Sequence, residues 1–207
     1  MGDEIDRTMQ RVRRYWFEDG LAEMAIGFVS VLVGLIFFVE ALAPPGLLPD
    51  SFSAFALPIV LVVGGWIAGQ LLKAAKARLT HPRTGYVAYR GATGRRRIVT
   101  AAAAFALAVL AAGLLRLEAF SPNWLATSEG LLFAAGLLYL GHSLGLARFY
   151  LLALLSALIG AATLLGNTGD VLGSAVLFAG LGVAMVASGA WALRSYLKQT
   201  QPPTTEV

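Results

Sequence analysis

Few side chains in the long apolar stretches of this sequence could do chemistry. His142 stands out because an imidazole titrates at about pH 6.5 and can exchange a proton or contact a ligand, and it lies six residues before Arg148. Tyr139 and Ser143 fall within one helical turn of His142, and Gln70 lies near the end of another apolar stretch. We expect His142 to be a turn histidine that hydrogen-bonds a carbonyl group or a lipid headgroup. The alternative is a polar cluster of His142 with these three side chains at the inner mouth of a helical bundle.

The second candidate site is the basic segment from Lys73 to Arg97 (KAAKARLTHPRTGYVAYRGATGRRR), which carries eight lysines and arginines. Basic charge signals topology in membrane proteins, and it also attracts anionic lipid headgroups by about 1 kcal/mol for each residue near the surface. We expect lipid or phosphate contacts from arginines of this segment and of the N-terminus, namely Arg11, Arg14, Arg83, Arg95, Arg96 and Arg97. A third interpretation is a phosphate site formed by His81, Arg83 and Thr84 beside loop amides. All three interpretations stay open.

Most catalytic and metal chemistry is excluded by composition. The absence of cysteine excludes disulfides, thiolate metal sites and cysteine nucleophiles. With two histidines, His81 and His142, a zinc or di-iron site would depend almost wholly on carboxylates. We therefore expect no metal, no cofactor and no enzymatic activity. An enzyme that acts on lipid headgroups through His81 and Arg83 is the least favoured alternative.

The elements that position these residues are membrane-spanning helices. The 207 residues are 57% hydrophobic and 14% charged, whereas a soluble domain carries about a quarter charged residues, and the mean hydropathy is +0.72. A membrane-crossing helix needs about 20 mostly apolar residues. Six stretches meet this length, at residues 21–43, 53–72, 98–117, 124–142, 147–165 and 171–193. The sequence therefore predicts an all-α, six-span transmembrane bundle over residues 21–198, followed by a disordered tail at 199–207.

The distribution of basic residues predicts the orientation of this bundle. Cytoplasmic loops of membrane proteins are enriched in lysine and arginine. With six spans, fifteen of the sixteen basic residues fall on the face that carries both termini, and Arg116 falls on the other. Both termini are therefore expected in the cytoplasm, in a plasma membrane or a bacterial inner membrane. The charge is all next to the membrane, so the pI of about 9.7 does not indicate nucleic-acid binding.

Residues 1–20 predict an amphipathic helix on the inner membrane surface. Apolar residues recur at intervals of four, three and four between Ile5 and Trp16, and arginines line another side, which is typical of helices that lie in the interface. We expect nearby carboxylates to pair with arginines between Arg83 and Arg97, so that residues 1–20 and 73–97 form one basic cytoplasmic cap. These carboxylates are Glu18, Asp19 and Glu23.

Small residues and one proline predict how the helices pack. Small residues recur four apart in the pairs Ser30/Gly34, Gly65/Gly69, Gly141/Gly145 and Gly169/Gly173. This spacing lets helix backbones approach closely in lipid, and it predicts a compact bundle, with a dimer face as the alternative. Pro58 is expected in the first turns of its span, where proline is tolerated, and Lys76 is expected to snorkel from the inner interface.

These features together favour a non-enzymatic accessory or sensory protein of the membrane. We expect it to engage anionic lipid, and a protein partner, through the basic cap. The alternative is a small transporter or channel for a modest, apolar solute, with His142, Gln70 and Tyr139 near its inner vestibule. A polar cavity between the spans would favour transport, whereas closed packing would favour the accessory role. A homo-oligomer is compatible with both.

Overall fold

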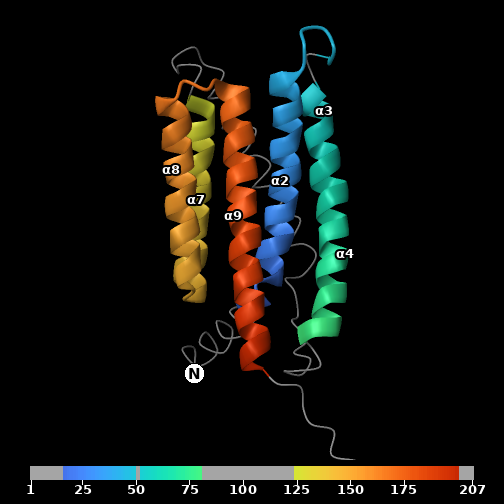
Figure 1. Ribbon diagram of the computed structural model, residues 1–207, viewed down its shortest axis with the longest axis vertical. Helices are drawn as coiled ribbons and strands as arrows, with labels where there is room; N and C mark the ends of the chain where they lie inside the picture. Colours follow the sequence, from blue (N-terminus) through green and yellow to red (C-terminus); the bar gives the residue numbers. More distant parts are fainter. Residues whose placement is uncertain (1–15, 50–51, 81–123, 201–207) are drawn as a thin grey trace, which may run out of the picture.

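The computed structural model of the chain describes residues 16–49, 52–80 and 124–200 (Figure 1). Most of these residues are helical, and no strand occurs among them. The helices are α2 (Leu21–Leu42), α3 (Phe52–Ile59), α4 (Gly65–Ala75), α7 (Trp124–Leu144), α8 (Ala147–Leu165) and α9 (Asp170–Gln199). The π-helical segment η1 (Val60–Gly64) joins α3 to α4, and a second, η2 (Lys76–Thr80), extends α4. The predicted all-α class is confirmed for the described part of the chain.

Five of these helices are long and apolar enough to cross a membrane. They are α2, the continuous helix over Phe55–Leu79, α7, α8 and α9, with 19 to 30 residues each. A helix of 20 residues is about 30 Å long, which matches the hydrocarbon core of a bilayer. Large apolar side chains cover their outer surfaces, among them Val62 at 72% exposure and Leu165 at 86%, and contiguous exposed apolar surface of this kind is typical of contact with lipid. The chain is a multi-pass membrane protein. The predicted span at 98–117 lies outside the described residues, so the count of six stays a prediction.

Direction alternates from α2 to α4 and again from α7 to α9, whereas α4 and α7 both run toward the same end of the bundle (Figure 1). At one end η2 meets the start of α2, through Lys76 and Asp19. At the other, the start of α7 meets the start of α9, through Leu125 and Asp170. All lysines and arginines of the described residues lie at the first end, which we call the basic end: Lys73, Lys76, Arg78, Arg148, Arg194 and Lys198.

The tightest contact joins α2 to α9 along glycines spaced seven residues apart. The facing pairs are Gly20–Gly189, Gly27–Gly182 and Gly34–Ala179. A Cβ atom at Gly27 would lie 2.7 Å from the carbonyl oxygen of Gly182, and a Cβ at Gly182 would lie 2.7 Å from that of Gly27. Ser30 Oγ donates a hydrogen bond to the Phe178 carbonyl oxygen at 2.9 Å between the same two helices. Because lipid provides no hydrophobic drive between helices, this close backbone approach stabilises the pair by packing.

The pairing of α7 with α8 depends on two reciprocal hydrogen bonds. Thr127 Oγ1 of α7 donates to the Gly160 carbonyl oxygen of α8 at 2.8 Å, and Ser156 Oγ of α8 donates to the Gly130 carbonyl oxygen of α7 at 2.8 Å. Each hydroxyl thus lies against a glycine of the other helix, where no side chain separates it from the backbone. A core of apolar side chains, including Phe149, lies between this pair and α9.

The second spanning helix is irregular directly after Pro58. This proline is the seventh residue of α3, in its second turn and so within the predicted first turns, but past the first helical position, where proline is best tolerated. It has no N–H to donate to the carbonyl group four residues earlier, and η1 follows directly, as is typical where the regular hydrogen-bond ladder is disturbed. The helix continues unbroken into α4. It is also sparsely packed, since 6% of the residues in its most apolar 18-residue stretch are buried, whereas the corresponding share in α9 is 39%.

Candidate functional site at the basic end

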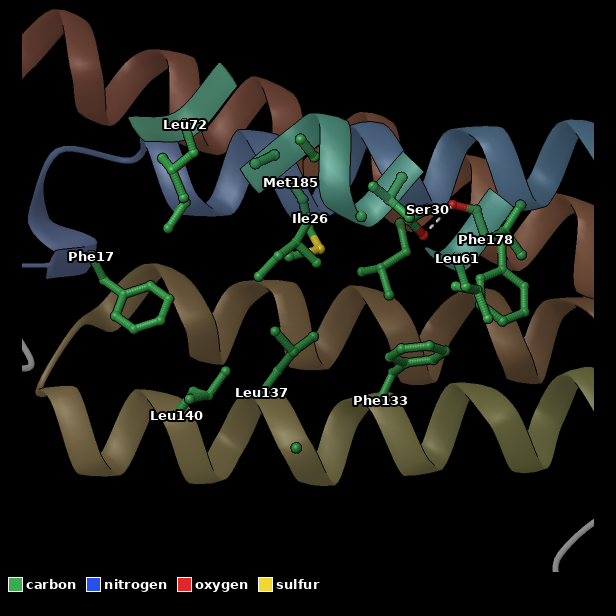
Figure 2. Close-up of a pocket in the computed structure, with 18 of the residues that line it drawn as sticks. Phe17, Ile26, Ser30, Leu61, Leu72, Phe133, Leu137, Leu140, Phe178 and Met185 are labelled. Carbon is green, nitrogen blue, oxygen red and sulfur yellow. Dashed lines mark hydrogen bonds between the residues drawn. The ribbon is translucent and has the colours of Figure 1, made fainter. Parts of the chain in front are cut away.

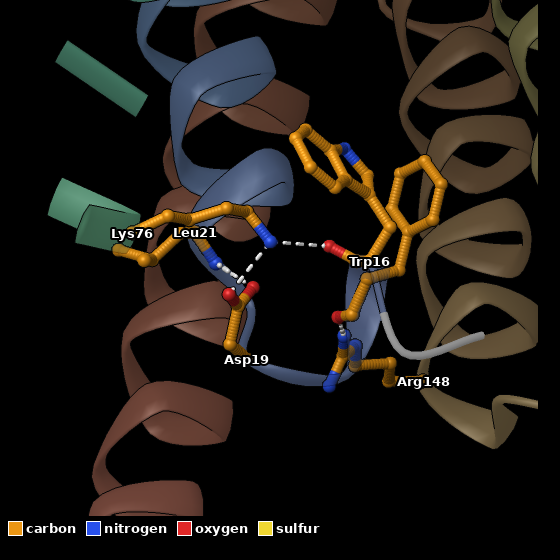
Figure 3. A network of polar contacts seen from close by, with 6 residues as sticks. Trp16, Asp19, Leu21, Lys76 and Arg148 are labelled. Carbon is orange, nitrogen blue, oxygen red and sulfur yellow. Dashed lines mark hydrogen bonds and ion pairs between the residues drawn. The ribbon is translucent and has the colours of Figure 1, made fainter. Parts of the chain in front are cut away.

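Two buried ion pairs lie at the basic end, and Figure 3 shows the one between Lys76 and Asp19. Lys76 Nζ of η2 lies 2.7 Å from Asp19 Oδ2, and these side chains are 5% and 1% exposed. Arg148 Nε of α8 lies 2.8 Å from Glu23 Oε2 of α2, with exposures of 14% and 0%. The second pair is poorly aligned for a hydrogen bond, so its attraction is chiefly coulombic. Ser188 of α9 also faces Glu23. The ion pairs therefore join the start of α2 to the second spanning helix and to α8.

The backbone before α2 is shaped to place Asp19 inward. Gly20 has a φ of +72°, a left-handed conformation that glycine adopts without steric cost, and it packs against the backbone of Gly189. Asp19 Oδ1 then accepts a hydrogen bond from the N–H of Leu21 at 3.1 Å. That N–H belongs to the first turn of α2, where backbone donors have no partner within the helix. One carboxylate thus satisfies the end of α2 and pairs with Lys76.

The aromatic residues before α2 are fastened by the same cations. Lys76 Nζ donates to the Trp16 carbonyl oxygen at 2.8 Å and lies 4.2 Å from the centroid of the Trp16 ring, within the range of a cation–π contact. Arg148 donates to the Phe17 carbonyl oxygen. The ring of Phe17 meets that of Phe149 edge to face, at 6.1 Å between centroids. Residues 16 and 17 therefore form a fixed bridge across the basic end.

This cluster contains two cations and two carboxylates, and it is better suited to holding helices together than to binding a ligand. Each of its two cations already has a carboxylate within 2.8 Å, so neither is available to capture an anion. Desolvation makes a buried pair weak evidence of net stability, but removal of one partner leaves an uncompensated charge and costs about 3–5 kcal/mol. The cluster thus ties together three elements that are far apart in the sequence.

An apolar cavity of about 780 Å³ opens above the aromatic bridge, between α2, α4, α7 and α9 (Figure 2). Trp16 and Phe17 bound it toward the basic end, and its walls are aliphatic and aromatic, with Ile26, Leu137 and Met185 among them. Ser30 is a polar side chain of this lining, and its hydroxyl is already bonded to Phe178. The surface can hold an apolar group by packing, and it offers no described charge to an ion or a polar solute.

The four residues of the predicted vestibule cluster do not line the apolar cavity. Tyr139 is 69% exposed, His142 and Gln70 are exposed, and Ser143 is partly buried and donates to the Leu140 carbonyl oxygen at 3.2 Å. None of these four residues is among the described residues that line the apolar cavity. The structure places His142 in the last turn of α7, and the turn to α8 follows at Gly145 and Leu146.

The other predicted site residues fall outside the described residues. They are Arg11 and Arg14 of the N-terminal segment, and His81, Arg83, Thr84, Arg95, Arg96 and Arg97 of the basic segment. Their roles stay predictions. The basic end nevertheless carries exposed cations that the structure does describe, namely Lys73, Arg78, Arg194 and Lys198.

Sequence reasoning missed the partners of the buried carboxylates. The expectation that Lys76 snorkels is wrong, because the residue is 4% exposed and paired with Asp19. Arginines of the basic segment were the expected partners of Asp19 and Glu23, whereas the described partners are Lys76 and Arg148. The sequence does show one cation, Lys76 or Arg148, near the basic end of each helix that faces the start of α2. This position indicates that the cation and the carboxylates lie at the same depth, but it does not indicate which way each helix is rotated about its axis.

A buried carboxylate at the opposite end was also missed. Glu129 of α7 accepts a hydrogen bond from Ser174 Oγ of α9 at 2.7 Å, and Ser174 is fully buried. The sequence alone places Glu129 among the acidic residues on the side of the membrane opposite the basic residues, without a partner. Its position one turn inside an apolar helix was the signal that it faces another helix.

Searches of protein-family models, of curated proteins and of solved structures found no match to this chain.

Proposed function

We propose that this multi-pass membrane protein is a non-enzymatic accessory or sensory protein whose basic end engages anionic lipid headgroups. In this proposal the bundle has six spans, both termini are cytoplasmic, and the membrane is a plasma membrane or a bacterial inner membrane. A protein partner binds at the same end. The proposal concerns binding at a surface and requires no metal or cofactor.

The observation that carries the proposal is the sorting of charge along the bundle. All six lysines and arginines in the described part of the chain lie at the basic end, and four of them are exposed. Lysine and arginine enrichment marks the cytoplasmic side of a membrane protein. The cytoplasmic leaflet carries anionic lipids, which attract each nearby basic residue by about 1 kcal/mol. The two buried cations, Lys76 and Arg148, are excluded from this role by their carboxylate partners.

The alternative, a small transporter or channel for an apolar solute, is favoured by one observation. The apolar cavity is large enough for a small molecule, since ligand pockets are typically about 300–1,000 Å³, and its described lining suits an apolar solute. A transporter for a polar solute or an ion would need polar groups along the path. The predicted vestibule residues do not contribute to this cavity.

The proposal is tested by native mass spectrometry of the protein released from nanodiscs that contain phosphatidylglycerol and phosphatidylcholine. The variant Arg78→Gln, Arg194→Gln, Lys198→Gln removes three exposed cations. At about 1 kcal/mol each, it should lower retention of phosphatidylglycerol by about a hundredfold at low salt, and the effect should shrink as salt is added. A second variant, Arg95→Gln, Arg96→Gln, Arg97→Gln, tests the basic segment in the same way.

The matched control is Glu18→Gln, which removes an exposed negative charge at the same end and should leave retention unchanged or higher. Equal retention of phosphatidylglycerol by the wild type and both triple variants would refute lipid engagement through the basic end. A tightly held small molecule that is indifferent to all of these substitutions would favour the transporter alternative. The same spectra report a bound partner or a second copy.

A further inference from the structure

The apolar cavity is about as deep as one leaflet of a bilayer (Figure 2). Its lining residues run from Leu61 to Leu72 on the second spanning helix and from Leu132 to Leu140 on α7. At 1.5 Å per residue these stretches rise by about 16 Å and about 12 Å. The hydrocarbon core of a bilayer is about 30 Å thick, so the cavity extends from the basic end through roughly half of it. The acyl chains of one leaflet lie at this depth.

The cavity is continuous with the lipid-facing surface between the second spanning helix and α7. Leu61 and Leu132 line the cavity from these two sides and are 56% and 58% exposed. A Cβ atom built at Gly69 or at Gly136, which also line it, would have nothing within 4 Å among the described residues. Side chains in the described part of the chain therefore leave this space open, and exposed apolar surface of this kind is typical of contact with lipid.

The lining of the cavity favours a hydrocarbon guest. Its described residues are mostly aliphatic side chains, phenylalanines and glycines, and the hydroxyl of Ser30 is already bonded to the Phe178 carbonyl oxygen. Burying a polar group without a hydrogen-bond partner raises the free energy, so a guest with polar groups along its length is disfavoured. A hydrocarbon chain has no such groups and gains dispersion contacts with the walls.

The charge beside the cavity favours an anionic headgroup. A lipid tail is as apolar as the cavity walls, so the headgroup must supply much of the preference for one lipid over another. Lys76 lies over the ring of Trp16 but is paired with Asp19. Lys73 follows Leu72, a residue of the lining, and is exposed. A lysine stem can lie along apolar surface while its ammonium group reaches the interface, where anionic headgroups lie.

We propose that one acyl chain of an anionic phospholipid occupies the apolar cavity, with its headgroup beside Lys73. The phospholipid belongs to the leaflet at the basic end. The aromatic bridge of Trp16 and Phe17, held by Lys76 and Arg148, bounds the chain's space toward that end. This site rests on the proposed function, from which it takes the anionic lipid, and it adds a defined binding position to the attraction by exposed cations.

Fluorescence quenching tests the site, because bromine atoms on an acyl chain quench the fluorescence of a tryptophan that they contact. Trp16 lines the cavity, whereas Trp66 is 66% exposed on the outer surface. Two full-length proteins each keep one of these tryptophans and carry phenylalanine at the other three tryptophan positions, which include Trp124 and Trp191. They are placed in phosphatidylcholine vesicles that contain a minor share of brominated phosphatidylglycerol or, separately, of brominated phosphatidylcholine.

The expected result is that brominated phosphatidylglycerol quenches Trp16 about fivefold more effectively than brominated phosphatidylcholine, the equivalent of about 1 kcal/mol for one lysine near an anionic headgroup. Trp66 reports the surrounding lipid and should show a smaller difference. Lys73→Gln should remove the preference at Trp16 and leave quenching by brominated phosphatidylcholine unchanged.

Leucine substitutions that fill the cavity test the position of the chain. Gly136→Leu fills it from α7 and should abolish the preferential quenching of Trp16, and Gly69→Leu should do the same from α4. The matched control is Ala135→Leu, which places the same side chain on the neighbouring exposed residue of α7, outside the lining. That control should leave the quenching of Trp16 as it is in the wild type.

Unchanged quenching of Trp16 in both leucine variants would overturn the cavity site. Equal quenching of wild-type Trp16 by the two brominated lipids would overturn the selection of an anionic headgroup beside Lys73. Quenching of Trp16 by both lipids that is weaker than that of Trp66 would assign the cavity to a second copy or to another part of this chain.

The retention test of the proposed function separates the two possible failures. The variant Arg78→Gln, Arg194→Gln, Lys198→Gln leaves Lys73 and the cavity lining intact. Loss of phosphatidylglycerol from this variant, with unchanged Trp16 quenching in the leucine variants, would keep the proposed function and reject the cavity site. Full retention by this variant, with quenching abolished in Gly136→Leu, would reject the general attraction and keep the cavity site.

Discussion

The pair between Lys76 and Asp19 makes the sharpest prediction, because both side chains are almost fully buried and the perturbation can be confined to one charge. Lys76→Met keeps the length and packing of the side chain and removes its ammonium group. Asp19 would then remain buried at 1% exposure, with the Leu21 N–H still donating to Oδ1 but without its cation.

The expected loss of stability follows from the geometry. Two unit charges 2.7 Å apart attract by about 6 kcal/mol at an effective dielectric constant near 20, and part of this is offset by the desolvation that the variant recovers. Breaking a buried pair typically costs about 3–5 kcal/mol. The variant also loses the hydrogen bond to Trp16 and the contact with its ring. We expect Lys76→Met to lower the free energy of unfolding by about 3–5 kcal/mol.

The assay is thermal unfolding in detergent, followed by circular dichroism at helical wavelengths. For a chain of about 200 residues, 1 kcal/mol shifts Tm by about 2–4 °C, so a loss of 3 kcal/mol lowers Tm by roughly 6–12 °C. The matched control is Lys73→Met, one turn earlier on the same helix, where the lysine is exposed. That change should stay within about 0.5 kcal/mol.

A double-mutant cycle with Asp19→Asn isolates the pair. The amide side chain of the Asp19→Asn variant keeps an acceptor for the Leu21 N–H, so the double variant should be more stable than the sum of the single losses predicts, by about 0.5–3 kcal/mol. Equal effects of Lys76→Met and Lys73→Met, or strict additivity in the cycle, would refute the argument that a buried ion pair fastens the second spanning helix to the start of α2.

Two further predictions concern the helix contacts. Gly27→Ala should destabilise the fold by about 1–3 kcal/mol in thermal unfolding, because its Cβ would meet the Gly182 carbonyl oxygen at 2.7 Å. The control Gly64→Ala, whose Cβ would have its nearest contact at 3.7 Å, should be neutral or stabilising. Equal losses from the two variants would contradict the glycine contact. Thr127→Val should lower the free energy of unfolding by about 0.6–1.7 kcal/mol, because it removes the interhelical hydrogen bond to Gly160. Denaturant titration compares it with Thr168→Val, which changes a partly buried loop threonine. A larger loss for Thr127→Val would show that the interhelical bond stabilises the fold.

Several features of the fold could be read from the residues alone. The apolar stretches predicted at 21–43, 124–142 and 147–165 overlap the observed α2, α7 and α8, because the length of an apolar run is a local property. The turn after Gly141 was also local, since Gly145 adopts a φ of +65° between α7 and α8. The apolar span predicted at 53–72 lies within the second spanning helix, which continues to residue 80, but the pairing of Lys76 with Asp19 could not be read from the sequence around Lys76.

Helix contacts could be predicted only in part. Spacing of four correctly marked Ser30 and Gly34, which contact Phe178 and Ala179 of α9, and Gly141, which packs against Tyr150. It also marked Gly65 and Gly69, which meet nothing in the described part of the chain. The decisive pattern between α2 and α9 has a spacing of seven, through Gly27 and Gly182. Both spacings place residues on one side of a helix, and the choice between them depends on which neighbour that side meets.

Hydropathy and charge can be summed along a single chain, so residue order alone predicts that the chain is helical, that it enters a membrane and that its described cations share one end. The folded arrangement is needed to see that Asp19 pairs with Lys76, that Glu23 pairs with Arg148 and that an apolar cavity separates α4 from α7. Those features depend on the rotation of each helix about its axis and on the choice of its neighbours. Many rotations bury the same apolar area in lipid, so they are selected by contacts between helices that are distant in the sequence.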